Sequence, residues 1–559
     1  MGKVDGGSLV GRTLADEGVE QAFVLCGGHI MPALYGMRNA GIEIIDMRHE
    51  CSALYAAIAY TRATGKIAAV ITTAGPGVGN TAAGMMEADS MNIPVVHIGG
   101  AVALAKRDAG DLQDMSTLGL MESISKWARK VTIADRIPEY VSMAFRHATD
   151  ANPGPVYLEI PTDLLFTKVD EASLRPSMPS PAAAIAAGHP DLIEQAAELL
   201  AGAERPALLL DDGARPTIGS DAAAVADLSD HLKMPVGIAG NGCRGLFGNE
   251  SSNRLLNTNA MRSADVVLAM GCRFDYRWGH GRSIAKEAKV IQVHTDRSQI
   301  GFNVRADIAI VGGTGPVARQ LLDSVGSMRE AETGDSWVGP VGGKTTADLP
   351  EVYRDPKTPI HPARCAGEAA KFLEEMGRDW SLVIDGGEAS VWMGGASTAY
   401  KGGQIHATGP NGTIGTGPGL AIGAWAATGK PVLWYTGDGS FGFYSMEMET
   451  MARLGMPVVC VISNDSSWGM ISLVEKHIRP EEIEEMGSCN TDLHPMRAYE
   501  KIVAMWDGHG EQVTDPDEIL PAIKRAAANG RPSIVNVQID NESLSPFISP
   551  YVEMVKGTS

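Results

Sequence analysis

The sequence lacks the features that mark a secreted or membrane-bound protein. Its seven cysteines are an odd number, scattered along the chain and never arranged as Cys-x-x-Cys, which argues against a disulfide framework and a zinc site. No apolar stretch is long enough to cross a membrane, and the first residues lack the basic-then-apolar order of a signal peptide. We therefore expect reduced thiols, a cytoplasmic location and no membrane partner.

Basic runs are also missing. The chain carries 47 Lys and Arg against 67 Asp and Glu, and no cluster of positive charge stands out. An acidic surface of this kind repels phosphate backbones and anionic lipids. We therefore expect no nucleic-acid partner, and a small molecule as the substrate.

The chain is long, and one pattern of apolar runs, turns and helical segments repeats along it. Its 559 residues exceed what one core supports and predict about three domains at roughly 150 residues each. Short Val-, Ile- and Leu-rich runs alternate with Gly or Pro turns and helical segments, a pattern typical of parallel sheets covered by helices. The predicted strands are 22–25, 42–46, 67–72, 95–98, 156–160, 206–211, 234–238, 265–270, 289–293, 381–385, 431–435, 458–463 and 533–539.

The predicted fold class is α/β, with three doubly wound parallel-sheet domains at residues 1–172, 188–342 and 358–543. A Pro-, Ala- and Ser-rich stretch at 175–188 is expected to be an exposed linker. The apolar, Pro-punctuated tail 544–559 either covers the active site or simply docks on the surface.

The clearest candidate for a functional site lies at the ends of two predicted strands in the third domain. The strand 431–435 runs into Gly437, Asp438, Gly439 and Ser440 and then into a helical pattern. Ligands bind at such strand ends, where glycines let backbone amides approach phosphate oxygens. The next predicted strand ends in Asp465, which brings a second oxygen ligand to the same edge. Taken alone, Gly-Asp-Gly is more often a polar turn, but two matched strand ends favour a site for magnesium and a diphosphate.

This pattern resembles the magnesium and diphosphate motif of thiamine diphosphate-dependent enzymes, which opens Gly-Asp-Gly-Ser and closes Asn-Asn. Here Asp465 stands in place of the second Asn, and its extra charge would tighten the metal or change diphosphate affinity. The resemblance implies thiamine diphosphate and Mg²⁺ as cofactors. It implies metal coordination by Asp438, Asp465 and the backbone oxygen of Ser467. The residues that it implies for cofactor contact are Glu50, Gly387, Ile414, Gly437, Asp438, Gly439, Ser440 and Asp465.

Glu50 follows the strand 42–46 and precedes a helix predicted at 53–62. It matches the family's catalytic glutamate, which protonates the cofactor's aminopyrimidine ring. A lone Glu here would otherwise be a helix N-terminal acid stabilised by the dipole. Ile414, in the glycine-rich segment 409–417, matches the aliphatic residue that bends the cofactor, although an isolated Ile would ordinarily be a core side chain.

Over nearly the whole chain the resemblance is closest to benzaldehyde lyase and the 2-hydroxyacyl-CoA lyases. His29 and Gln113 match polar residues around the reacting carbonyl, with roles in proton shuttling and oxyanion contact. The aromatic walls of benzaldehyde lyase are replaced here by Cys26, Thr162 and Ser390. Segment 439–450 resembles oxalyl-CoA decarboxylase and 2-hydroxyacyl-CoA lyase, and together these differences favour an acyl-CoA substrate.

Further pocket residues follow from the same resemblance. Ile483 and Glu484 look like an active-site pair of bacterial 2-hydroxyacyl-CoA lyases, with Leu118 as their pocket partner. Glu484 is then a second catalytic acid or base, although four Glu in this short segment would also suit a solvated helix face. Four arginines of the middle domain are candidates to receive CoA phosphates, namely Arg244, Arg273, Arg277 and Arg282.

The function expected on this basis is that of a carbon–carbon lyase and reversible carboligase, which cleaves 2-hydroxyacyl-CoA to formyl-CoA and an aldehyde or ketone. Three alternatives stay open: an acyloin lyase acting on free 2-hydroxy ketones, a 2-oxo acid enzyme similar to acetolactate synthase, and an inactive scaffold. Family architecture implies at least a homodimer, and we expect a homotetramer. The middle domain has no Gly-x-Gly-x-x-Gly to support a dinucleotide.

Overall fold

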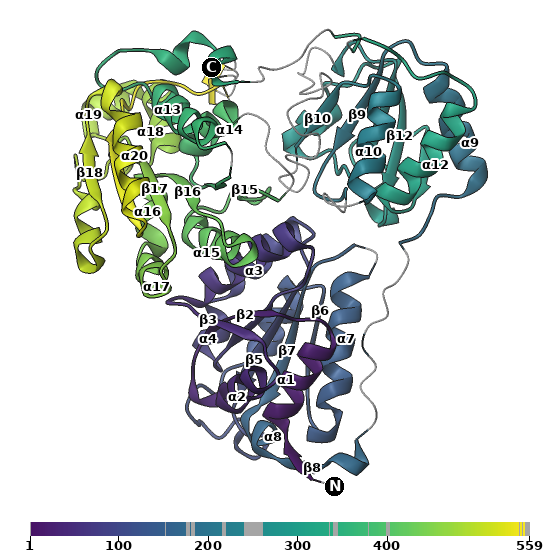
Figure 1. Ribbon diagram of the computed structural model, residues 1–559, viewed down its shortest axis with the longest axis vertical. Coiled ribbons are helices and arrows are strands. Elements are labelled where there is room, and N and C mark those ends of the chain that lie inside the picture. The colour runs from purple at the N-terminus through teal and green to yellow at the C-terminus, as the bar shows by residue number, and fades with distance from the viewer. Residues whose placement is uncertain are drawn as a thin grey trace. The chain divides into compact units, whose positions relative to one another are not determined.

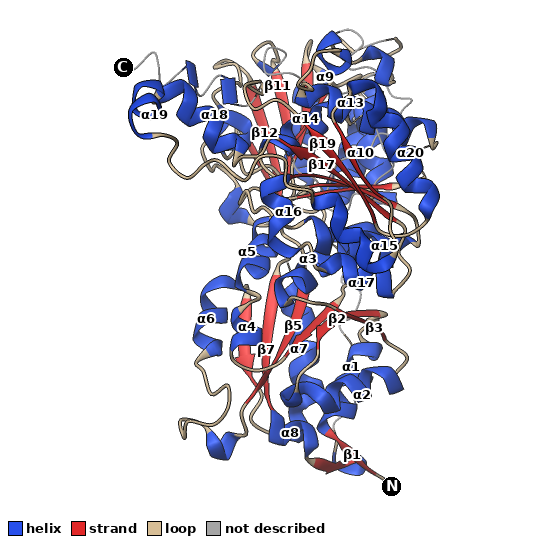
Figure 2. Cartoon of the chain, turned by 90° about the vertical axis from the view of Figure 1, so that its left-hand side faces the viewer, coloured by secondary structure: helices blue, strands red, loops and turns tan. Residues whose placement is uncertain are grey.

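The protein is built on three separate parallel sheets, each flanked by helices (Figures 1 and 2). The computed structural model describes residues 2–150, 152–174, 179, 185–214, 220–239, 261–334, 336–338, 345–377, 379–397, 403–546, 548–549 and 552–553. Within these residues, no helix is long and apolar enough to cross a membrane. The predicted class, α/β with three doubly wound parallel-sheet domains, is confirmed. Most of the predicted linker at 175–188 lies outside the described residues.

The first sheet has six strands, and alternate residues of its strands face a shared helix layer. On one face, residues such as Val24, Ile71, Ile98 and Leu158 form a core with three helices, α1 (Gly6–Asp16), α2 (Met31–Asn39) and α7 (Ile137–Thr149). This alternation is the period-two pattern of a strand. The strand order is β3 (Glu43–Asp46), β2 (Gln21–Leu25), β4 (Ala69–Thr72), β5 (Val95–Ala101), β7 (Pro155–Pro161) and β6 (Trp127–Lys130).

The second sheet has five strands and is covered on one face by helices α9 (Pro190–Ala201), α10 (Ser220–His231) and α12 (Thr314–Gly326). Its opposite face buries a smaller cluster that includes Phe274 and Trp278. The strand order is β10 (Val236–Ile238), β9 (Pro206–Leu210), β11 (Val266–Met270), β12 (Lys289–His294) and β13 (Ile308–Val311).

The third sheet positions the candidate site. Its order is β15 (Ile405–Ala407), β14 (Ser381–Ile384), β16 (Val432–Gly437), β17 (Val458–Asn464), β19 (Ser533–Gln538) and β18 (Gly510–Val513). From β14 the chain first adds β15 on one side and then β16 on the other, so the strand order reverses between β14 and β16. In parallel α/β sheets, the crevice at such a reversal is where ligands bind.

The strands missed by the sequence analysis share one property. Every strand predicted from the sequence overlaps one in the structure. The strands that were not predicted are β6, β13, β15 and β18, each at the edge of its parallel sheet, and the two strands of a small antiparallel sheet, β1 (Lys3–Asp5) and β8 (Lys168–Asp170). Edge strands are short and partly exposed, so their sequences need not be continuously apolar. β18, Gly510–Val513, shows this: of its four residues only Val513 is buried.

Candidate active site

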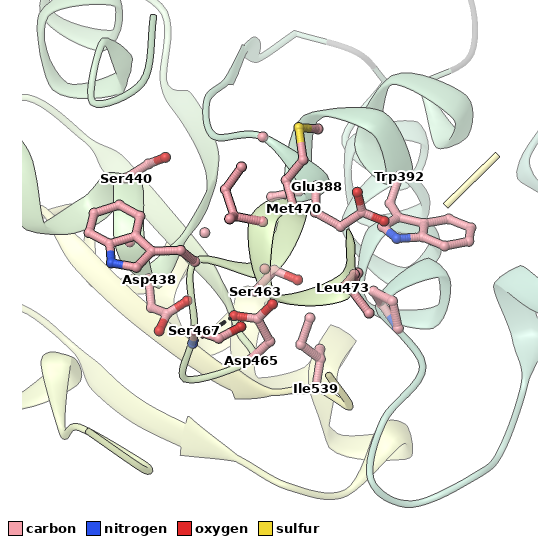
Figure 3. A pocket seen from close by; sticks show the side chains of 18 of the residues that line it. Glu388, Trp392, Asp438, Ser440, Ser463, Asp465, Ser467, Met470, Leu473 and Ile539 are labelled. Atoms are coloured by element: carbon pink, nitrogen blue, oxygen red, sulfur yellow. Dashed lines mark hydrogen bonds between the residues drawn. The ribbon is translucent and has the colours of Figure 1, made fainter. Parts of the chain in front are cut away.

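A pocket lies at the carboxyl ends of β14, β16 and β17, where the order of the third sheet reverses (Figure 3). β16 ends at Gly437 and α16 (Asp438–Tyr444) begins with the next residue. β14 leads into Gly387 and α14 (Glu388–Ala396), while β17 leads into Asp465 and α18 (Gly469–Ile478). The predicted site residues that line the pocket are Gly387, Ile414, Gly437, Asp438, Gly439, Ser440, Asp465 and Ser467.

Asp438 and Asp465 form a close carboxyl pair in this pocket. Asp438 is buried and Asp465 is half-buried. Burial, then the charge of Asp465 and a hydrogen bond between the two groups, raises the pKa of Asp438 to about 8. Burial also raises the pKa of Asp465. Without a cation, the pair therefore holds a shared proton near neutral pH, because two adjacent carboxylates do not both ionise readily.

A divalent cation fits this pair of residues. Carboxylate oxygens are the ligands that Mg²⁺ prefers, and a cation would remove the repulsion that the shared proton now relieves. Asp465 Oδ1 accepts a hydrogen bond from the Ser467 amide at 3.0 Å, which fixes the orientation of that carboxylate. Among the described residues no cluster of three His, Cys, Asp or Glu could hold a metal. The remaining ligands would therefore have to come from backbone oxygens, water and the bound phosphates.

Gly439, in the first turn of α16, has no room for a side chain. A β-carbon on Gly439 would stand 2.8 Å from the ring of Trp468, so any other residue would push the loop out of place. The half-buried Ile414 lines the same pocket from a different loop. The pocket thus combines backbone that a ligand can approach closely, a pair of carboxyl groups and an aliphatic wall. This combination suits a ligand with a charged phosphate end and an apolar ring.

Glu388 is a pocket residue that the sequence analysis missed. It is buried, and its carboxylate accepts hydrogen bonds from the Ser545 amide at 2.9 Å and from the Ser545 hydroxyl at 3.0 Å. Burial raises its pKa to about 7, while the Ser545 bonds oppose that shift. A Glu at the start of a helix is an ordinary capping residue in a sequence. No pattern in the chain could have shown that its partner lies in the tail.

The carboxyl-terminal tail packs beside the pocket through an apolar cluster. Ile548 and Val552 are buried against Leu473 of α18, with Leu544 beside them. Leu473 itself lines the pocket (Figure 3). The described part of the tail therefore supports one wall of the pocket. Whether the tail covers the substrate stays a prediction, since residues 554–559 lie outside the described residues.

Glu50 begins helix α3 (Glu50–Thr64) and is 6% exposed. The turn before it is anchored by Glu447 of α17 (Glu447–Arg453), whose Oε1 accepts from the amides of Arg48 at 3.0 Å and His49 at 2.9 Å. The His49 ring accepts a hydrogen bond from the Cys51 amide and packs against Tyr444 at a tilt, with ring centroids 4.6 Å apart. The backbone around Glu50 is therefore firmly held, as a catalytic acid requires.

His29 and Gln113 are brought together by Thr73, a residue that the sequence analysis did not name. The Thr73 hydroxyl donates to Gln113 Oε1 at 3.3 Å and lies 3.4 Å from His29 Nδ1. Gln113 has a backbone φ of 64°, which non-glycine residues rarely adopt. Such backbone strain clusters at functional sites. Thr73 follows β4, and a threonine after a strand carries no signal by itself.

The remaining predicted pocket residues lie in four places of the fold. Cys26 is exposed after β2, and Leu118 is half-buried on α6 (Thr117–Ile124). Ser390 is half-buried on α14. Ile483 and Glu484 lie on α19 (Pro480–Met486), where Glu484 is exposed, and neither lines the pocket described above. Their roles stay predictions.

The middle-domain arginines differ from the expectation for CoA phosphates. Arg277 pairs with Asp211 and Asp212, both at 3.0 Å, and with Asp275 at 2.7 Å. Three carboxylates already neutralise its guanidinium, so Arg277 is not available to a phosphate. Arg273 lies over the ring of Phe302 at 5.1 Å from its centroid, and Arg282 donates to a backbone carbonyl. Arg244 lies outside the described residues.

Comparison with known proteins agrees with this architecture. Models of the thiamine pyrophosphate enzymes match residues 4–120 with their N-terminal thiamine pyrophosphate-binding domain, residues 193–321 with their central domain, and residues 385–537 with their C-terminal thiamine pyrophosphate-binding domain. The third match contains Asp438, Asp465 and most of the residues that line their pocket. The chain belongs to the thiamine pyrophosphate enzyme family, and thiamine diphosphate is its cofactor.

Individual relatives fall into two groups. The acetolactate synthase large subunit IlvG of Mycobacterium tuberculosis is 31% identical, over 96% of this chain and 95% of the relative. A probable acetolactate synthase large subunit of Methanocaldococcus jannaschii is 29% identical, over 98% and 93%. The 2-hydroxyacyl-CoA lyase 2 of Danio rerio is 28% identical, over 96% and 91%. The chain is thus similar over its length to both a synthase and a lyase.

Proposed function

We propose that this protein is a thiamine diphosphate- and Mg²⁺-dependent carbon–carbon lyase that cleaves a 2-hydroxyacyl-CoA to formyl-CoA and an aldehyde or ketone. The reaction breaks the bond between the thioester carbon and the hydroxyl-bearing carbon. The hydroxyl proton leaves as the new carbonyl forms, and a proton is added to the thioester carbon. The reverse reaction joins formyl-CoA to a carbonyl compound.

The observation that carries the choice of substrate is the charge of the pocket. With Asp438 and Asp465 assigned to the cofactor's cation, the acidic residues left in the lining are Glu388 and Asp540, and none of the described lining residues is Lys, Arg or His. The carboxylate of a 2-oxo acid would need a cation to pair with in such a place. A thioester has no charge at its reacting end. The apolar side chains of Trp392, Met470 and Leu473 would suit an acyl chain.

Each residue has a distinct part in this proposal. Asp438, Asp465 and the backbone oxygen of Ser467 hold Mg²⁺, and Glu50, contributed by a second copy of the chain, holds a proton on the cofactor's aminopyrimidine nitrogen. Thiamine diphosphate, when bound, stabilises the negative charge left by bond cleavage. His29 moves the hydroxyl proton, and Gln113 hydrogen-bonds the carbonyl oxygen.

A second candidate is a 2-oxo acid enzyme of the acetolactate synthase type, favoured by the 31% identical relative. A third, an acyloin lyase similar to benzaldehyde lyase, shares the charge argument because its substrate is also neutral. The three differ in what the substrate carries: a thioester, a carboxylate or a ketone.

The test compares these substrates on one preparation. The purified protein with thiamine diphosphate and Mg²⁺ is given a 2-hydroxyacyl-CoA, the matching free 2-hydroxy acid, pyruvate and benzoin in separate reactions. We expect formyl-CoA and the aldehyde or ketone in equal amounts from the thioester alone, with none in the presence of a chelator. Acetolactate from pyruvate, or benzaldehyde from benzoin, without formyl-CoA would replace this proposal with the corresponding candidate.

A further inference from the structure

Asp385 is a buried carboxylate that ties two glycine turns together. It follows β14 and is 0% exposed. Its Oδ1 accepts from the amide of Gly386 at 2.7 Å and from the amide of Gly415 at 3.0 Å, and its Oδ2 accepts from the amide of Gly417 at 3.0 Å. Backbone amides thus bind both oxygens. A carboxylate satisfied in this way is held far more rigidly than a surface acid.

Each of the two turns carries a pocket residue. Gly386 precedes Gly387, and Gly415 follows Ile414, and both neighbours line the pocket. Gly415 has a φ of 80°, and a β-carbon there would meet Phe443 at 2.5 Å, so only glycine fits in this turn beside α16. The two turns are far apart in sequence, and Asp385 is the side chain that joins their amides.

We propose that Asp385 is a positioning residue for the cofactor, which fixes Gly387 and Ile414 at their contact positions before thiamine diphosphate binds. This inference rests on the proposed function only for the identity of the cofactor and not for the substrate. Its physical basis is preorganisation: a loop that is already ordered does not lose conformational freedom when the ligand arrives.

Asp385→Asn weakens the link between the two turns by removing one of its hydrogen bonds. The amide oxygen of Asn can still accept from Gly386 and Gly415, but its NH₂ group would face the amide of Gly417, and two donors repel. Residues 415–417, which follow Ile414, are then held by one hydrogen bond instead of two, while the side-chain volume stays the same. The variant loses the hydrogen bond from the Gly417 amide to a charged acceptor. We therefore expect the dissociation constant for thiamine diphosphate, measured with saturating Mg²⁺, to rise about 10- to 100-fold.

The matched control is Asp379→Asn. Asp379 lies just before the same strand, and its exposed side chain pairs with Lys430 at 3.3 Å. This control should bind the cofactor as the wild type does. Wild-type affinity in Asp385→Asn, or an equal loss in Asp379→Asn, would overturn the inference.

A double-mutant cycle distinguishes positioning from a general loss of stability. If Asp385 acts through the turn that carries Ile414, then adding Asp385→Asn to Ile414→Ala should weaken cofactor binding by less than the product of the single effects. The near-ultraviolet circular dichroism of the saturated cofactor should also change in the same direction in both single variants. Fully multiplicative effects with unchanged spectra would contradict a positioning role.

A measurement on the wild type covers the case in which the variant fails to fold. Hydrogen exchange of the cofactor-free protein should show slow exchange at the amides of Gly415 and Gly417, because Asp385 binds them without the cofactor. Fast exchange that slows only when thiamine diphosphate is added would overturn the proposal. None of these measurements uses a substrate. Their results therefore do not depend on whether the protein forms formyl-CoA.

Discussion

Ser545 donates two hydrogen bonds to Glu388, one from its amide at 2.9 Å and one from its hydroxyl at 3.0 Å. The two residues are distant in the chain, and both are buried. A carboxylate of the pocket is thereby attached to the carboxyl-terminal tail.

This contact predicts a pH dependence of stability. Burial raises the pKa of Glu388 from 4.5 to about 7 in the folded protein. Between these values the unfolded chain loses this proton while the folded protein keeps it, so the contribution of Glu388 to stability falls as the pH rises through this window. Glu388→Gln removes the titrating group. The glutamine side-chain oxygen can still accept from the Ser545 amide, and its NH₂ group can donate to the Ser545 hydroxyl.

The variant should therefore be more stable than the wild type at pH 8, by on the order of 1–3 kcal/mol, with the advantage vanishing near pH 4.5. Denaturant unfolding of the cofactor-free protein in a chelator measures this difference. A constant difference between the two proteins across the pH range would show that Glu388 does not titrate as described.

Asp465→Asn tests the carboxyl pair. The change keeps an oxygen ligand but removes the charge that helps to raise the pKa of Asp438. The cofactor-free variant should be more stable than the wild type at pH 8, and its Mg²⁺ affinity in the presence of thiamine diphosphate should fall roughly 10-fold, an effect of about 1.4 kcal/mol. Calorimetric titration and thermal unfolding measure the two effects. The exposed Asp507→Asn serves as the control, and finding neither effect would contradict the pairing.

Glu50→Gln tests the assigned catalytic acid. Glutamine fills the same space but cannot deliver a proton, so turnover should drop by about 10²- to 10⁴-fold. The affinity for thiamine diphosphate should change much less, because diphosphate and metal contacts are untouched. Steady-state rates and cofactor titrations provide the comparison, with the exposed Glu43→Gln as control. Unchanged turnover would show that the role assigned to Glu50 is wrong.

Thr73→Val tests the alignment of His29 and Gln113. Valine has the shape of threonine without its hydroxyl, so the hydrogen bond to Gln113 is lost while packing is kept. We expect kcat to fall about 3- to 10-fold, with the dissociation constant of thiamine diphosphate unchanged and with activity restored by Thr73→Ser. If Thr73→Ser were as impaired as Thr73→Val, the methyl group rather than the hydroxyl would be the important feature.

The sequence allowed the central strands and the polar turns after them to be predicted, because buried parallel strands are nearly continuous apolar runs. The Asp438 and Asp465 turns follow β16 and β17 directly, so their meeting at one sheet edge followed from the topology. Glu388, Asp385 and Thr73 could not be found in this way. Each has its role through a partner distant in sequence, and each is a common residue type at a strand or helix end.

The edge strands were missed for a related reason. β6 and β18 contain Lys, Arg, Glu and Gln because one side of each is open to solvent. Their place in the sheet comes from hydrogen bonding to a neighbour and not from their own apolar pattern.

We propose that Asp438 and Asp465 bind thiamine diphosphate through a divalent cation, and a cofactor titration tests this role most directly. Binding is measured for the wild type and Asp438→Asn, each with Mg²⁺ and with a chelator. We predict saturable binding to the wild type only with Mg²⁺, and binding weakened about 100-fold or more in a variant whose cofactor-free form is at least as stable as the wild type. Equal binding with and without Mg²⁺, or an Asp438→Asn variant that binds as the wild type does, would contradict the account.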